Sequence, residues 1–324
     1  MAFDAYKFTV PENKRFRVIV NTDCKNEADD QFALAHHLMT PKFDVRGIIA
    51  AHFEAKADEG KGESMQKSYD EILKVLELME LTGQYPVFKG APGPLPYDPA
   101  KAIRYNEGPE IPLMEQPQPV VSEGAQFIVD EAMREDDRPL FVVFLGAITD
   151  LASAYLMEPR IAGRLTAVWI GGGEYPAGEF EFNMYQDIQA SNIVLGSEID
   201  FWQIPKNVYK MLRVTLAELQ CRVAPHGKIG QYLFEQLVQY NDDYAWQQHW
   251  PQGESWNLGD QPTVSVLLEA HECEWEWWPA PLVSKDMYYV HHQNNRPIRV
   301  FKSVDSRMTL EDFYCKLQLN YGQK

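Results

Sequence analysis

Three aspartates near the amino terminus have the residue types and spacing of a metal site. Asp23 follows a short β-branched segment, and Asp29 and Asp30 open a segment with helical spacing. Aspartate is also common as a helix cap, so one such residue alone would indicate little. Several carboxylates at one strand end repel one another unless a cation neutralises them. Oxygen ligands without His or Cys favour Ca²⁺ or Mg²⁺ over Zn²⁺, and the three residues therefore predict a divalent-metal site.

The elements that would position these residues alternate along the first half of the chain. Near-continuous apolar segments read as strands at residues 16–20, 45–51, 86–88, 140–145 and 165–170. Between them lie segments with helical spacing at residues 30–39, 65–81, 122–133 and from Thr149 onward. This alternation predicts an α/β fold with a mostly parallel central sheet and helices on both faces. The turn-rich residues 90–119 keep apolar side chains, and no linker is evident, so we expect a single domain over residues 1–324.

In such sheets, ligands bind beyond the carboxyl ends of the strands. The residues that follow each apolar strand are therefore candidates for the site. They are residues 21–30, residues 52–54 with His52 and Glu54, residues 146–150 and residues 171–174. The acidic loop is the first of these segments.

Composition restricts the partners of the chain. The formal net charge is −17, which argues against nucleic acid and against an anionic membrane surface, because both need clustered Lys and Arg. The four cysteines lie far apart and indicate neither a zinc ribbon nor a disulfide framework. Residues 1–14 lack the apolar stretch of a signal peptide, and no run is long enough to span a bilayer. We therefore expect a cytoplasmic protein.

Several motifs, in this order, resemble the inosine-uridine-preferring nucleoside hydrolase family. Asn21-Thr22-Asp23 with Asp29-Asp30 resembles its amino-terminal Asp-Thr-Asp motif and double aspartate. Glu181-Phe182-Asn183 resembles its Glu-Phe-Asn segment. Further matches are residues 45–51, 74–78, 86–91, 144–152 with a Gly-Pro-Leu-Thr-Asn turn in the family, 169–173, and 258–262, where the family has His-Asp-Pro. The resemblance covers most of the chain.

The resemblance implies a Ca²⁺-dependent hydrolase of ribonucleosides. It implies that Ca²⁺ is bound by the side chains of Asp23, Asp29, Asp30 and Asp260 and by the Leu145 carbonyl. It also implies that Asp29, Glu181 and Asn183 bind the ribose, and that Asp23 is the general base on a metal-bound water. Cleavage of the C–N bond passes through an oxocarbenium-like transition state, for which a metal-oriented water and a carboxylate base are suitable groups. A homodimer or homotetramer is expected.

The match is weaker where the leaving base would lie. Two extra residues separate Asp23 from the double aspartate, and Asn21 stands where the family has aspartate. Gly259 replaces the histidine before the last metal ligand, and Glu54 falls near a family asparagine. The segment between residues 173 and 181 is short. These departures leave the base specificity open.

Aromatic residues and histidines near the motifs are candidates for the base pocket, although each is more often a packing residue. They are His52, Tyr244, Trp246, His249, Trp250 and Trp256, with His52 and Trp256 preferred because both lie close to a motif. His36-His37, Trp275–Trp278 and His291-His292 are expected to pack internally or to contact a partner subunit.

Three other functions compete with the nucleoside hydrolase. One is a hydrolase of the same fold that cleaves a different glycosidic bond, favoured by the altered leaving-group side. The second is a non-catalytic nucleoside- or sugar-binding protein, which would not need a base at Asp23. A phosphotransferase is the weakest alternative, because the chain lacks a phosphate-binding glycine loop.

Overall fold

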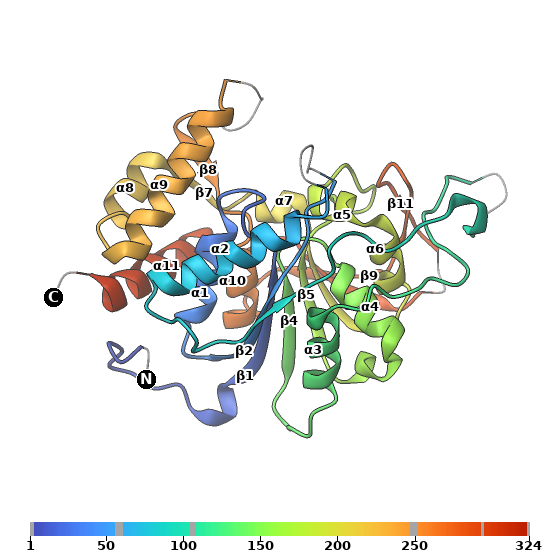
Figure 1. Cartoon of the computed structure of the whole chain (residues 1–324), viewed down its shortest axis with the longest axis horizontal. Helices are drawn as coiled ribbons and strands as arrows, with labels where there is room; N and C mark the ends of the chain where they lie inside the picture. The colour runs from blue at the N-terminus through green and yellow to red at the C-terminus, as the bar shows by residue number, and fades with distance from the viewer. Residues whose placement is uncertain (1–2, 56–60, 104–107, 247–251, 293–294, 323–324) are drawn as a thin grey trace.

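The computed structural model describes residues 3–55, 61–103, 108–246, 252–292 and 295–322. Its centre is an eight-stranded sheet in the order β3-β2-β1-β4-β5-β6-β12-β9 (Figure 1). All neighbours pair in parallel except β12 and β9, which are antiparallel. The strands are β1 (Phe16–Thr22), β2 (Phe43–Ala50), β3 (Val87–Lys89), β4 (Leu140–Phe144), β5 (Thr166–Ile170), β6 (Asp200–Ile204), β12 (Pro297–Phe301) and β9 (Trp275–Pro279). The prediction of a mostly parallel α/β sheet is confirmed.

The helices cover both faces of this sheet. They are α1 (Asp30–Leu38), α2 (Ser64–Leu78), α3 (Glu123–Ala132), α4 (Thr149–Met157), α5 (Phe182–Gln186), α6 (Ile188–Leu195), α7 (Lys206–Tyr209), α8 (Leu216–Arg222), α9 (Gly227–Tyr244), α10 (Pro262–Glu269) and α11 (Ser306–Tyr321). The described residues also form the short 3-10 helices η1 (Glu12–Lys14), η2 (Pro99–Lys101) and η3 (Pro159–Gly163). Small antiparallel ribbons pair β7 (Arg213–Thr215) with β8 (Ser255–Asn257) and β10 (Leu282–Val283) with β11 (Tyr289–Val290). The strands and helices predicted up to residue 170 all occur, with ends shifted by a few residues.

Alternation along the strands builds the two halves of the core. Val18 and Val20 of β1 belong to a hydrophobic cluster with α1, α2, α9, α10 and α11, and the intervening Ile19 belongs to a second cluster with α3, α4 and α6. Successive strand residues point to opposite faces, so a continuously apolar strand is buried on both sides. No helix among the described residues is both long enough and apolar enough to cross a membrane.

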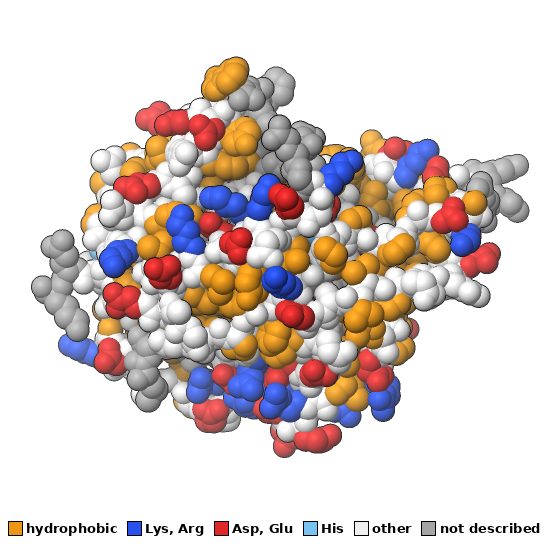
Figure 2. Space-filling view, viewed as in Figure 1, with side chains coloured by type: hydrophobic (Ala, Val, Ile, Leu, Met, Phe, Trp, Pro, Cys, Tyr) orange, Lys and Arg blue, Asp and Glu red, His pale blue; other side chains and the backbone are white. Residues whose placement is uncertain are grey.

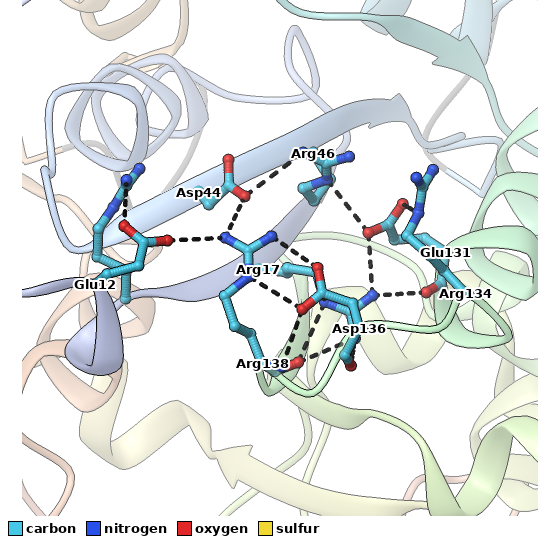
Figure 3. Close-up of polar contacts among 9 residues, drawn as sticks. Glu12, Arg17, Asp44, Arg46, Glu131, Arg134, Asp136 and Arg138 are labelled. Carbon is cyan, nitrogen blue, oxygen red and sulfur yellow. Dashed lines mark hydrogen bonds and ion pairs between the residues drawn. The ribbon is translucent and has the colours of Figure 1, made fainter.

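An ionic network joins the amino-terminal ends of the central strands (Figure 3). Glu131 of α3 is buried and pairs with Arg17 of β1 at 3.1 Å, with Arg46 of β2 at 3.2 Å and with Arg134 at 2.9 Å. The Arg138 guanidinium beside Asp136 holds the pKa of that carboxyl well below its usual range. In Figure 2 basic and acidic side chains gather along the lower edge of the molecule, below the strands in Figure 1. The network stabilises the ends of the strands that lie opposite to the acidic loop.

Candidate active site

The carboxyl ends of the central strands bring the acidic residues together. Asp29, Asp30 and Asp260 each offer a carboxylate oxygen, and these oxygens all lie within 4.8 Å of one another. All three side chains are buried. Asp29 and Asp30 start α1, directly after the loop from β1, while Asp260 precedes α10. Residues separated by some 230 positions thus meet at one point, which the sequence linked only through the family resemblance.

The loop between Asp23 and the double aspartate takes a tight path. Lys25 has a φ of 87°, in the left-handed region, and the backbone N–H of Asn26 donates to the Asp23 carbonyl at 2.9 Å. This turn accommodates the two extra residues and lets the chain enter α1. Asp30 is fixed from the preceding strand, because the Thr22 hydroxyl donates to its Oδ1 at 2.5 Å.

The Asp23 carboxylate lies against the turn that follows β4. A Cβ added to Gly146 would collide with the Asp23 side chain, which is only 1% exposed. The neighbouring Leu145 carbonyl accepts a hydrogen bond from Asn183 Nδ2 at 2.7 Å and has a second lone pair available. The Asp23 side chain therefore contacts Gly146, the residue that follows Leu145 in the chain.

Burial makes this group of carboxylates costly in the absence of a cation. Burial raises the pKa of Asp29 to about 6, although backbone N–H groups, including that of Gly259, act in the opposite direction. The pKa of Asp260 is raised well above its usual range by burial and then by the charges of Asp29, Asp30 and Asp23. Carboxylates in this state are stabilised by a bound cation. The donor set of buried carboxylate and carbonyl oxygens fits a hard divalent ion such as Ca²⁺.

Glu181 and Asn183 lie on the next wall, at the start of α5. Glu181 caps this helix, and burial raises the pKa of its carboxyl despite four hydrogen bonds. Asn183 is anchored through both amide hydrogens, one to Leu145 and the other to the Ile170 carbonyl at 2.9 Å. The structure thus links the Glu-Phe-Asn segment directly to the residue beside Asp23.

His52 is held in a buried chain of hydrogen bonds. Its Nε2 lies 2.9 Å from the Thr149 hydroxyl, which in turn donates to Asp187 at 2.8 Å. Because the Thr149 proton goes to Asp187, the His52 Nε2–H must be the donor to Thr149. Burial lowers the pKa of His52 to about 4, so this imidazole is neutral at pH 7. A neutral ring of this kind is a poor acid for a leaving base.

Glu54 is turned toward the start of α2. Its carboxylate accepts hydrogen bonds from the backbone N–H of Gly62 at 2.6 Å and of Ser64 at 3.0 Å, and also from the Ser64 hydroxyl. Burial acts to raise the pKa of Glu54, but these hydrogen bonds outweigh it and lower the pKa. The predicted contact of Glu54 with substrate stays a prediction.

Two of the aromatic candidates for the base pocket pack against one ring, that of Tyr240. Trp256 of β8 is buried in the hydrophobic cluster on the α1 side and packs edge-on against Tyr240, with ring centroids 5.6 Å apart. Tyr244 stacks obliquely on the same Tyr240, whereas Trp246 is 80% exposed. His249 and Trp250 lie outside the described residues. A role for any of them in base binding stays a prediction.

The residues expected to pack behave differently from one another. His36 and His37 of α1 are fully buried, and His36 contacts Gln261 and Asp312, which confirms internal packing. Trp277, on the edge strand β9, is 53% exposed.

Two features of the site were not predicted from the sequence. Tyr209 ends α7 and donates its hydroxyl proton to Glu181 Oε1 at 3.1 Å. Tyr209 lies in the segment that follows the carboxyl end of β6. This segment would have been a candidate for the site if β6 had been predicted as a strand. Asn21 donates from Nδ2 to Asp150 Oδ2 at 3.0 Å. Asn21 and Asp150 thus form a buried amide–acid pair that joins the end of β1 to the start of α4.

Comparison with known proteins agrees with this geometry. Residues 18–313 match the family described as inosine-uridine preferring nucleoside hydrolase. The pyrimidine-specific ribonucleoside hydrolase RihA of Salmonella paratyphi A is 25% identical over 234 residues, covering 69% of this chain and 72% of the relative. Two solved structures share the fold, each with a TM-score of 0.70 and 18% identity. The plant nucleoside hydrolase PpNRh1 matches over 93% of this chain and 98% of its own, and the purine-preferring ribonucleoside hydrolase from Gardnerella vaginalis over 94% and 99%. The chain belongs to the inosine-uridine preferring nucleoside hydrolase family.

Proposed function

We propose that the chain is a Ca²⁺-dependent N-ribohydrolase, a single domain over residues 1–324 that converts ribonucleosides to ribose and free base. The observation that carries the proposal is the cluster of Asp29, Asp30 and Asp260, three buried carboxylates within 4.8 Å at the carboxyl ends of the strands. Asp23, Asp29, Asp30, Asp260 and the Leu145 carbonyl would hold the ion. When bound, such a cation acidifies and orients a water and binds the ribose diol.

Asp23 is the proposed general base. Its carboxylate is buried against Gly146, and its charge is close enough to Asp260 to raise the pKa of that carboxyl. As water adds to C1′ and the C1′–N bond breaks, Asp23 takes up a proton from the water and the bonding electrons leave with the base. Asp29, Glu181 and Asn183 are the proposed residues on the side of the sugar, and His52, Glu54 and Trp256 are the proposed contacts on the side of the base.

The proposal extends to assembly and location. We propose a homodimer or homotetramer in the cytoplasm whose partner is a small riboside rather than nucleic acid or a membrane. The net charge of −17 supports the choice of partner, because phosphate-rich surfaces are bound by clustered Lys and Arg.

The experiment is to measure reducing-sugar release from purine and pyrimidine ribosides with Ca²⁺ or with a chelator. We expect release that the chelator abolishes. Asp23→Asn keeps an oxygen ligand but cannot take the proton, so we expect retained riboside binding and turnover at least ~10²-fold lower. Asp44→Asn is the matched control, because Asp44 lies at the opposite edge of the sheet beside Arg138. No release from any riboside, or unchanged turnover in Asp23→Asn, would refute the proposal.

A further inference from the structure

Tyr209 contacts two parts of the candidate active site, the cap of α5 and the backbone next to Asp260. Its hydroxyl donates to Glu181 Oε1 at 3.1 Å. At the other side, its Cδ2 lies 3.3 Å from the point that a Cβ on Gly259 would occupy, and Asp29 Oδ2 lies 3.4 Å from the same point. The absence of a side chain at Gly259 leaves this room to the ring. The phenol therefore extends from the backbone beside Asp260 to the carboxylate that caps α5.

The hydrogen bonds of Glu181 leave no acceptor position for a sugar. A carboxylate oxygen accepts about two hydrogen bonds. Oε2 already accepts from the backbone N–H of Gly172 at 2.8 Å and of Met184 at 2.9 Å. Oε1 accepts from the backbone N–H of Asn183 at 3.1 Å and from Tyr209. Three of the four donors are backbone groups in a turn and a helix start, and they cannot move away.

Asn183 has a different atom to offer. Both of its amide hydrogens are donated to carbonyl groups, those of Leu145 and Ile170. Its Oδ1 is therefore the only polar side-chain atom of Asn183 that can receive a hydroxyl. On this wall, a sugar hydroxyl that seeks an acceptor meets Asn183 Oδ1 or the oxygen of Tyr209.

We propose that Tyr209 is a riboside-binding residue, whose phenolic oxygen accepts a hydrogen bond from one sugar hydroxyl while donating its own proton to Glu181. This inference rests on the proposed function and refines it, because Glu181 then acts through Tyr209 as a positioning residue. A phenol that donates to a carboxylate keeps acceptor capacity, and that donation makes its oxygen a stronger acceptor. Displacement of Tyr209 by the sugar would instead lose one charge-assisted bond for each one formed.

The test couples a residue to a substrate hydroxyl. The Ca²⁺-loaded full chain and its Tyr209→Phe variant are assayed with one riboside and its 2′-, 3′- and 5′-deoxy analogues. We expect Tyr209→Phe to raise KM for the parent riboside about two- to tenfold, the usual effect of one hydrogen bond. For the analogue that lacks the bound hydroxyl, the variant and the wild type should have the same KM. Tyr209→Leu removes the ring as well, and it should also have the same KM as the wild type for that analogue.

Tyr314→Phe is the matched control, because Tyr314 also donates to a glutamate, Glu218, at 3.0 Å, but between α11 and α8. It should leave KM unchanged for all four substrates. An equal rise in KM for all four substrates in Tyr209→Phe would overturn the inference, since it would indicate packing alone. A lower KM for the parent would also overturn it, because Tyr209 would then compete with the sugar. If the wild type cleaves no riboside, the proposed function fails and this inference fails with it, whereas cleavage with unchanged KM in Tyr209→Phe removes the inference alone.

Discussion

Asp260 carries the charge whose removal tests the metal site most directly. Burial and the neighbouring carboxylates raise its pKa well above the usual range. Asp260→Asn keeps the shape and one oxygen but removes an ionisable group that is buried among other carboxylates. In chelator, we therefore expect the variant to be more stable than the wild type.

The expected shift is measurable by thermal unfolding. With about 2.1 cal/mol/K of unfolding entropy per residue over 324 residues, each kcal/mol of added stability raises Tm by about 1.5 °C. Saturating Ca²⁺ should reverse the order, because the wild type gains about 4 kcal/mol at an ion concentration of about 1,000 Kd and the variant has lost a ligand. The assay is calorimetry of both proteins in chelator and in Ca²⁺.

For a control substitution of the same kind, we expect the opposite change in Tm. Asp136 lies in the ionic network, and Arg138 lowers its pKa, so neutralising it removes a favourable charge. Asp136→Asn should lower Tm in both buffers and keep the full response to Ca²⁺. The reasoning is refuted if Asp260→Asn is less stable than the wild type in chelator, or if Ca²⁺ raises Tm equally in both.

Three further predictions concern the pH dependence of stability, the proposed base contact of Trp256 and the ionic network. Because the pKa of Asp29 is raised to about 6, the metal-free folded state takes up a proton that the unfolded state does not, and it gains stability as the pH falls from above 6 toward 4. The rise in Tm caused by Ca²⁺ should shrink over the same range, since bound ligands must be deprotonated; an unchanged rise in calorimetry at pH 5 would contradict this. Trp256→Ala should change kcat/KM by different factors for purine and pyrimidine ribosides, and equal factors would remove Trp256 from the base pocket. Glu131→Gln removes the nearer and more deeply buried of the two charged partners of Arg17, and it should cost about 3 kcal/mol in urea unfolding at unchanged turnover per folded molecule. A loss of turnover would show that the ionic network also affects catalysis.

Local sequence pattern was sufficient for the first five strands and their helices. Segments such as residues 140–145 are apolar throughout, which is typical of strands buried on both faces. The later strands were not predicted. One of them, β9, has the sequence Trp-Glu-Trp-Trp-Pro without a buried residue, and it joins the sheet only through β12. The order of strands in a sheet depends on pairing between distant segments, and the hydrophobic pattern of a single segment does not indicate its neighbours.

The same limit applies to the site. Asp23, Asp29 and Asp30 were predicted from their own spacing, since one loop holds them all. Asp260 required the family resemblance, because nothing near residue 260 indicates that α10 starts beside α1. Tyr209 was missed because its contact with Glu181 depends on β6 lying next to β5.

The pair of Asn21 and Asp150 restricts which side chains these two positions can carry together. An aspartate at position 21 opposite Asp150 would put two buried carboxylates 3.0 Å apart, in the place of the present hydrogen bond. Two asparagines, in contrast, remain compatible, because Asp150 accepts from Ser122 and from the Ala91 N–H on Oδ1 alone, and the Asn21 amide can turn over to present its own oxygen. The double amide is therefore compatible with this buried position as it stands, whereas the double acid must take up a proton before it can be buried.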